Sequence, residues 1–297
     1  MSRLSLSALA GIALLALAGC GDGTSAEGAD GKVAVVASTN VWGSVARAVG
    51  GDYVDVRSLI DDPSADPHAH PDKPEDATAL AGADLVVFNG GGYDDFFTKL
   101  VEGTGTAAKQ VDAFALSGHG ADANEHVWYD LPTVGKVADR IAADLGAIDP
   151  GHRVAYTANA ETFGAHLDTL VADAGKIGAA HPGAKVVATE PVAHYLLLAA
   201  GLTDATPAQF SEAVEEETDP PVSAFVATTG LITGKQVAML IDNAQTETVV
   251  TDALIDSARH ADIPVVIVTE TLPRGVSGYV EWMTGELDAV ADALAAT

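Results

Sequence analysis

Eight short apolar runs, arranged as two groups of four, constrain the fold of this 297-residue chain more than any other feature. In the first half they cover residues 32–39, 54–60, 84–90 and 110–114, and in the second 185–190, a weaker 206–210, 237–243 and 264–270. Helical intervals are expected at 42–49, 74–81, 192–200, 223–233 and 248–260. Continuous apolar strands that alternate with helices are typical of parallel sheets covered on both faces. The sequence therefore predicts an α/β protein of two lobes, each a mainly four-stranded parallel sheet flanked by helices.

The segment between the two halves has the pattern of a single long amphipathic helix. From Tyr156 onward, apolar residues recur at spacings of three and four. Asp149 can cap this helix with Pro150 in its first turn, and Pro182 can end it. Thirty helical residues would span about 45 Å, enough to run along both lobes. We therefore expect an N-terminal lobe over residues 32–148, a linking helix over 149–182 and a C-terminal lobe over 183–297.

The N-terminal residues 1–20 have the features of a bacterial signal peptide. Their apolar stretch, residues 9–18, is too short to cross a bilayer as a helix. It is followed by Leu-Ala-Gly and then Cys20, the only cysteine, which resembles a lipobox and implies lipidation of that sulfur. The alternative is a plain secretory signal with a chance cysteine. We expect an exported chain, lipid-anchored to the outer face of the cytoplasmic membrane, with residues 21–31 as a flexible tether.

The charge of the chain argues against one class of partner. A formal net charge of −27 repels nucleic acid and anionic lipid, so nucleic-acid binding is not expected. Most of the acidic residues are interpreted as solvated surface. The acidic run at 212–219 is interpreted as a loop whose charge is explained by solvation, with guidance of cations or contact with a partner as the alternative. The charge alone therefore does not predict a metal site.

Four metal-capable side chains lie near the ends of predicted strands. They are His68, His126, Glu190 and Glu270. His126 follows the run at 110–114 across a loop rich in glycine, aspartate and asparagine. Strand ends are where open parallel sheets place ligand-binding groups. Two imidazoles and two carboxylates would make a closed coordination shell for one ion.

Six segments in a fixed order carry a resemblance that covers nearly the whole mature chain. They are residues 38–52, 66–76, 83–96, 125–131, 188–196 and 263–273. With these segments the chain resembles the cluster A-I solute-binding lipoproteins of zinc or manganese ABC importers, the ZnuA/TroA-like family. The resemblance implies two α/β lobes joined by a long helix, with one ion held between them by His68, His126, Glu190 and Glu270. It also implies a monomer that delivers its ion to the permease and ATPase of an importer, and that is not an enzyme.

The donor set leaves the identity of the ion open. Many zinc-importing relatives have histidine where this chain has Glu190, and aspartate where it has Glu270. Two carboxylates suit the higher coordination numbers of Mn²⁺, whereas intrinsic affinity favours Zn²⁺. We expect Zn²⁺, with Mn²⁺ as the alternative.

Other side chains compete for roles in the site. His194 lies one helical turn after Glu190 and is its rival as a ligand, and Arg274 is an alternative partner for Glu270. His70 and His119 are possible accessory metal-binding residues.

Two other functional classes stay open at this point. An exported metalloenzyme can also use two histidines with a carboxylate, but it needs an open coordination position and a general acid or base. No His-Glu-x-x-His helix, Gly-x-Ser-x-Gly elbow or cysteine nucleophile is present. A metal-buffering or adhesin-type surface lipoprotein could use the same fold.

Overall fold

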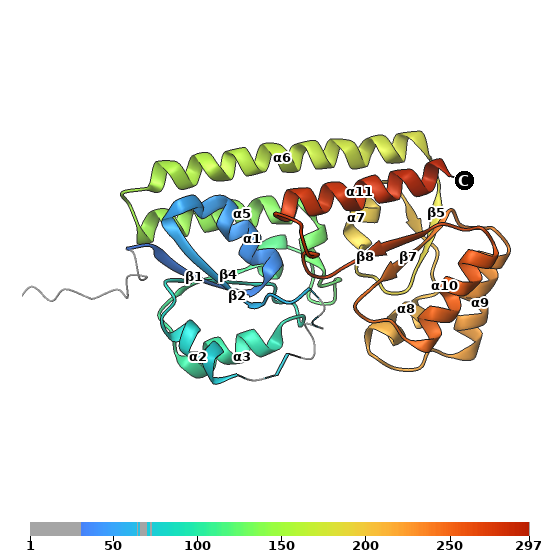
Figure 1. Ribbon diagram of the computed structural model, residues 1–297, viewed down its shortest axis with the longest axis horizontal. Helices are drawn as coiled ribbons and strands as arrows, with labels where there is room; N and C mark the ends of the chain where they lie inside the picture. Colours follow the sequence, from blue (N-terminus) through green and yellow to red (C-terminus); the bar gives the residue numbers. More distant parts are fainter. Residues whose placement is uncertain (1–30, 64, 66–69, 72, 297) are drawn as a thin grey trace, which may run out of the picture.

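Two lobes lie side by side beneath one long helix (Figure 1). This computed structural model describes residues 31–63, 65, 70–71 and 73–296. The expected signal peptide, Cys20 and nearly all of the expected tether lie outside these residues. Among the described helices, none is long and apolar enough to cross a membrane.

The N-terminal lobe is built on a parallel sheet with the strand order β2-β1-β3-β4. Its strands are β1 (Val33–Thr39), β2 (Val54–Ile60), β3 (Leu85–Phe88) and β4 (Lys109–Asp112). The C-terminal sheet, also parallel, repeats this topology as β6-β5-β7-β8. Its strands are β5 (Lys185–Ala188), β6 (Thr203–Asp204), β7 (Met239–Asn243) and β8 (Val265–Val268). The predicted fold class, two four-stranded parallel sheets, is confirmed.

The weak strand expected at 206–210 is wrong. The second strand of the C-terminal lobe is instead the two-residue β6, and residues 208–215 form a helix. Pro207 stands at the N-cap of that helix. Proline has no N–H to donate to a sheet, and its fixed φ suits the start of a helix. The apolar residue in this run, Phe210, is therefore buried by a helix.

Helices cover both faces of each sheet. In the N-terminal lobe they are α1 (Asn40–Gly50), α2 (Pro74–Ala81), α3 (Asp95–Thr104), α4 (Ala113–Ser117) and α5 (Leu131–Ile148), with the 3₁₀ turns η1 (Gly51–Tyr53) and η2 (Val127–Tyr129). In the C-terminal lobe they are α7 (His194–Ala199), α8 (Ala208–Glu215), α9 (Val222–Thr233), α10 (Val249–His260) and α11 (Tyr279–Ala295). Of these helices, five lie outside the helical intervals expected from the sequence: α3, α4, α5, α8 and α11.

The linking helix α6 spans Arg153–Ala180, inside the predicted 149–182. The expected cap is wrong, because His152 is the N-cap residue and Asp149 lies before it. Asp149 instead accepts a hydrogen bond of 2.9 Å from the hydroxyl of Tyr156. The glycine at 151, a poor helix former, separates Pro150 from the helix.

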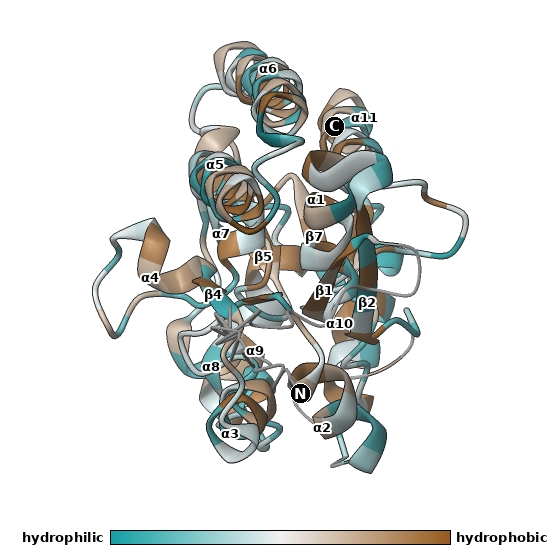
Figure 2. Cartoon of the chain, turned by 90° about the vertical axis from the view of Figure 1, so that its left-hand side faces the viewer, coloured by the Kyte–Doolittle hydropathy of each residue, from teal (hydrophilic) through white to brown (hydrophobic). Residues whose placement is uncertain are grey.

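α6 joins the two lobes through one continuous core. Its buried face is apolar and comprises Tyr156, Ala160, Phe163, Leu167, Leu170 and Ala174. This face contacts α1 and α5 of the N-terminal lobe and α7 and α11 of the C-terminal lobe. Seen end-on, α5, α6 and α11 lie together above the strands (Figure 2). Because the same hydrophobic cluster includes strands of both sheets, the lobes are held in a defined orientation.

Candidate metal centre

Two predicted ligands of the C-terminal lobe come together at one edge of its sheet. Glu190 follows β5 and Glu270 follows β8, and Asn243 ends β7, the strand between them. The Asn243 Nδ2 donates to Glu190 Oε2 at 2.6 Å and to Glu270 Oε1 at 2.8 Å. Both carboxylates are buried, with 4% and 2% exposure. The sheet order reverses between β5 and β7, which is where parallel sheets bind ligands.

His126 enters the site from the N-terminal lobe, just before η2, and is 1% exposed. Its Nδ1 lies 3.0 Å from the Asn124 Oδ1. The Asn124 Nδ2 donates to the Pro191 carbonyl at 2.9 Å, which identifies Oδ1 as the acceptor. Nδ1 therefore carries the proton, and Nε2 presents the lone pair that a metal ion requires.

Aromatic side chains hold the His126 imidazole in place. The Trp128 ring lies edge-on with its centroid 5.0 Å from that of His126, and the Tyr93 ring lies at 6.0 Å. Asn124 also joins the lobes, because its carbonyl accepts a 2.7 Å hydrogen bond from the Tyr195 hydroxyl.

Glu215, the last residue of α8, also lies in the site. Its Oε1 lies 3.7 Å from His126 Nδ1, and its side chain is 21% exposed. Burial is the main cause that raises the pKa of Glu215 to about 8, followed by the negative charges of Glu125, Glu190 and Glu270. The negative charges of three other glutamates therefore repel that of the Glu215 carboxylate at this site. Solvation alone, the preferred interpretation of the run 212–219, does not hold for Glu215, whose side chain is mostly shielded at the end of α8.

Among the described residues, one group offers metal-ligand atoms that all lie within 4.8 Å of one another. It comprises Glu125, His126 and Glu215. Glu190 and Glu270 are not in this group, although they lie at the same site. The sequence carried no signal for Glu215, since its place depends on how α8 packs. Asn243 could have been found, because it is a polar residue at the end of a buried strand.

The other candidate residues lie as follows. His68 is outside the described residues. The His70 Nε2 lies 2.9 Å from Asp76, and its ring packs on Phe96. The His119 Nε2 lies 3.0 Å from Asp130.

His194, the rival of Glu190, is the first residue of α7, so the helix begins two residues after the start of the expected interval 192–200. Burial lowers the pKa of His194. Arg274 is largely exposed, and its Nη2 lies 3.3 Å from Asp62. The alternative pairing of Arg274 with Glu270 is therefore wrong, and the Glu270 carboxylate accepts a hydrogen bond from Asn243.

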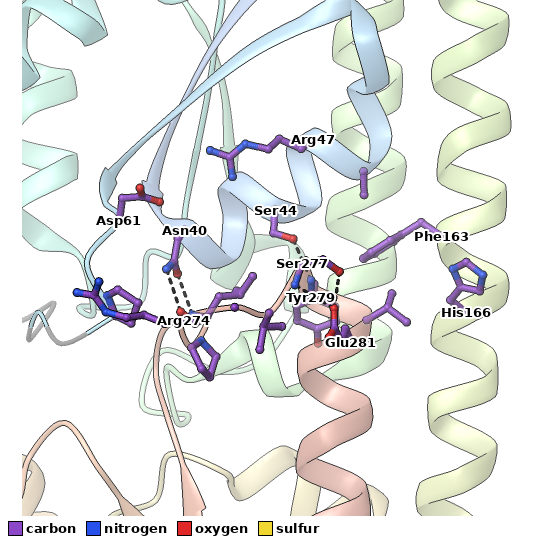
Figure 3. A pocket seen from close by; sticks show the side chains of 18 residues that line it. Asn40, Ser44, Arg47, Asp61, Phe163, His166, Arg274, Ser277, Tyr279 and Glu281 are labelled. Atoms are coloured by element: carbon purple, nitrogen blue, oxygen red, sulfur yellow. Dashed lines mark hydrogen bonds between the residues drawn. The ribbon is translucent and has the colours of Figure 1, made fainter.

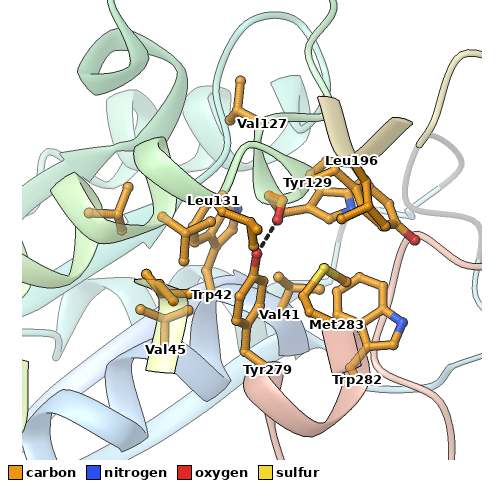
Figure 4. Packing of buried hydrophobic residues seen from close by; sticks show 14 of the residues in the cluster. Val41, Trp42, Val45, Val127, Tyr129, Leu131, Leu196, Tyr279, Trp282 and Met283 are labelled. Atoms are coloured by element: carbon orange, nitrogen blue, oxygen red, sulfur yellow. Dashed lines mark hydrogen bonds between the residues drawn. The ribbon is translucent and has the colours of Figure 1, made fainter. Parts of the chain in front are cut away.

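The loop from β8 to α11 fastens the second lobe to the first. Asn40 exchanges two hydrogen bonds with the backbone of Leu272, and the Tyr279 N–H donates to Ser44 (Figure 3). The Tyr279 hydroxyl donates to the Trp128 carbonyl at 2.6 Å (Figure 4). These bonds position Glu270 relative to His126.

A cavity of about 800 Å³ lies behind this loop, between α1, α6 and the start of α11 (Figure 3). Its polar lining includes Arg47, His166, Arg274 and Glu281. None of the described ligand candidates lines it. The cavity is therefore separate from the candidate metal centre.

The family described as "Zinc-uptake complex component A periplasmic" matches residues 35–293. The manganese-binding lipoprotein MntA of Bacillus subtilis is 30% identical over 176 residues, which cover 57% of this chain and 57% of MntA. The iron ABC transporter substrate-binding lipoprotein MtsA of Streptococcus pyogenes is 26% identical over 328 residues, with 99% of both chains covered. The chain thus spans little more than half the length of MntA but almost all of MtsA.

Among solved structures, the periplasmic zinc-binding protein TroA from Treponema pallidum is similar with a TM-score of 0.76. The two share 18% sequence identity, and the similarity covers 89% of this chain and 99% of TroA. At this identity the similarity shows a shared fold.

Proposed function

This chain belongs to the family of periplasmic zinc-uptake complex component A proteins, and from that membership we propose that it captures a divalent metal ion outside the cytoplasm and delivers it to an ABC importer. The ion is cargo on this proposal, and the chain is a binding protein, not an enzyme. The partners are the permease and ATPase of the importer. The chain would act as a monomer, held at the outer face of the cytoplasmic membrane by a lipid on Cys20.

The observation that carries the proposal is the pair of buried carboxylates that share one amide. Glu190 and Glu270 both accept from Asn243 Nδ2, so two negative charges lie close together away from water. Burying a second like charge beside the first is costly unless a cation offsets both. A divalent ion supplies that charge, and the Nε2 of His126 supplies a nitrogen ligand. We propose His68 as the fourth ligand.

The arrangement of ligands also supports delivery. His126 belongs to the N-terminal lobe, and Glu190 and Glu270 belong to the C-terminal lobe. A permease that shifts one lobe against the other would separate the nitrogen ligand from the oxygen ligands. Protonation of the ligands would weaken metal binding and so would also promote release of the ion.

Substitution of the two glutamates tests the proposal. Glu190→Gln and Glu270→Gln should each lower metal affinity at least ten-fold in competitive titration, while the circular dichroism spectrum stays unchanged. Each glutamine keeps the size of the side chain and removes its charge. The matched control is Glu161→Gln on the exposed face of α6, which should bind metal as the wild type does. Unchanged affinity in both site variants would refute the site.

We propose Zn²⁺ as the cargo and Mn²⁺ as the alternative. The imidazole ligands and the general affinity order favour Zn²⁺, whereas the carboxylates favour Mn²⁺. Metal content of the protein purified from cells, measured with competitive titration of both ions, decides between them. A five- or six-coordinate Mn²⁺ site that withstands competition by Zn²⁺ would overturn the choice.

A further inference from the structure

A second group of possible metal ligands lies beside the buried pair Glu190 and Glu270, and it consists of Glu125, His126 and Glu215. Their ligand atoms lie within 4.8 Å of one another, a spacing that one divalent ion can bridge. Glu125 and Glu215 are partly exposed, whereas His126 is buried. The group therefore reaches from solvent to a buried histidine, and its member Glu215 lies near enough to Glu190 and Glu270 to interact with their charges.

The Glu215 carboxylate is placed to receive a cation. Its Oε1 is shielded from solvent and has no hydrogen-bond partner among the described residues, although the side chain as a whole is 21% exposed. It lies at the C-terminal end of α8, where the helix dipole adds partial negative charge. A buried carboxylate oxygen without a donor is costly, and a passing cation removes that cost.

The other two members of the group are held by the N-terminal lobe. The Asn89 Nδ2 donates to the backbone carbonyl of Glu125 at 2.8 Å. The backbone N–H of His126 donates to Asn124 at 2.9 Å. Glu215 comes from the C-terminal lobe, so this group, like the inner site, is assembled from both lobes.

We propose that Glu125, His126 and Glu215 form an outer binding position that takes the divalent cation from solution and passes it, through His126, to Glu190 and Glu270. The inference rests on the proposed function, because it concerns the same ion. In the outer position the ion keeps part of its water shell and binds two carboxylate oxygens. It then exchanges those oxygens for the inner pair, with Nε2 of His126, the nitrogen that carries no proton, as the common ligand.

A transient position has a kinetic signature that a permanent ligand lacks. Loss of an intermediate slows capture and release by the same factor, because the dissociation constant depends only on the free and final states. Loss of a permanent ligand instead raises the dissociation constant, mainly through faster release. The two roles of Glu215 are therefore separable by rate measurements.

The experiment mixes the metal-free protein with Zn²⁺ alone, and separately with Mn²⁺ alone, in a stopped-flow fluorimeter. Trp128, whose ring lies 5.0 Å from that of His126, is the fluorescent reporter. Glu215→Gln should lower the capture rate about ten-fold and the release rate by a similar factor. Glu125→Gln should change both rates in the same direction.

Glu212→Gln is the matched control, since it removes one negative charge from the same helix one turn earlier. This variant controls for the general electrostatic attraction of cations, and we expect its capture and release rates to differ from those of the wild type by less than two-fold. Capture by Glu215→Gln at the rate of this control would overturn the inference. A loss confined to faster release would also overturn it, because Glu215 would then be a permanent ligand. Failure of the wild-type protein to bind either ion would instead refute the proposed function.

Discussion

Asn243 determines how the two buried glutamates of the candidate site are arranged, so its loss should affect both stability and metal binding. In Asn243→Ala, Glu190 and Glu270 lose hydrogen bonds of 2.6 and 2.8 Å. A hydrogen bond to a charged group contributes about 1.5–3 kcal/mol. Loss of both would cost about 3–6 kcal/mol, and water that enters the space of the amide should reduce this to about 3 kcal/mol.

This cost should be measured in the metal-free protein. For a chain of this size, 1 kcal/mol corresponds to about 2–4 °C, so we expect Tm to fall by roughly 6–12 °C in the presence of a chelator. Metal affinity should fall about 10–100-fold, the usual effect of removing a residue that orients a metal ligand. Differential scanning calorimetry and competitive titration give the two values.

Asn159→Ala provides a comparison for the loss of a partly buried amide. The Asn159 Nδ2 donates one 3.0 Å hydrogen bond to a neutral carbonyl, that of Val49, far from the candidate ligands along the chain. We expect a cost of about 1 kcal/mol and no change in metal affinity. If Asn243→Ala keeps metal affinity within two-fold of the wild type, Asn243 does not orient the ligands, and the reasoning fails.

Three further outcomes are expected. Burial raises the pKa of Glu286 from 4.5 to about 8, so the unfolded chain releases this proton at lower pH than the folded chain, and stability falls as pH rises from about 4.5 to 8. In Glu286→Gln the side chain can still accept a hydrogen bond from Trp282, but it no longer titrates, so the fall in the free energy of unfolding between pH 5 and pH 8 should be about 3 kcal/mol smaller than in the wild type. Urea unfolding at the two pH values in the presence of a chelator measures this difference, and equal pH dependence in both proteins would contradict the assignment. Free metal at about 1,000 times the dissociation constant should raise stability by about 4 kcal/mol over the chelated protein, and an unchanged Tm would argue against a native-state site. Cys20→Ala should shift the protein from the membrane fraction to the soluble fraction, which immunoblotting of fractionated cells would show, and retention at the membrane would exclude the lipid anchor.

Local patterns in the sequence predicted most of the secondary structure of the two sheets. Strands such as Val54–Ile60 and helices such as Pro74–Ala81 were expected with the same bounds. The weak strand at 206–210 failed because Pro207 begins a helix there. The prediction also missed α5 and α11, which pack against α6 at the junction of the lobes.

The candidate metal ligands were predicted from their positions near the ends of predicted strands. Glu190 and Glu270 could be predicted to lie close together because the ends of neighbouring parallel strands meet at one edge of a sheet. Their shared donor, Asn243, carried the same kind of signal at the end of β7. Glu215 carried none, because an acidic run gives no information on which of its members turns inward.

The two-lobed α/β fold, the linking helix and the strand ends that carry carboxylates could be predicted from the amino-acid sequence. These features follow from local periodicity, which each segment expresses without its partners. Two contacts became apparent in the folded molecule alone: Asn243 bridges Glu190 and Glu270, and Glu215 reaches His126 from the other lobe. Those contacts join residues far apart in the chain, and they depend on how α6 and its neighbours orient the lobes.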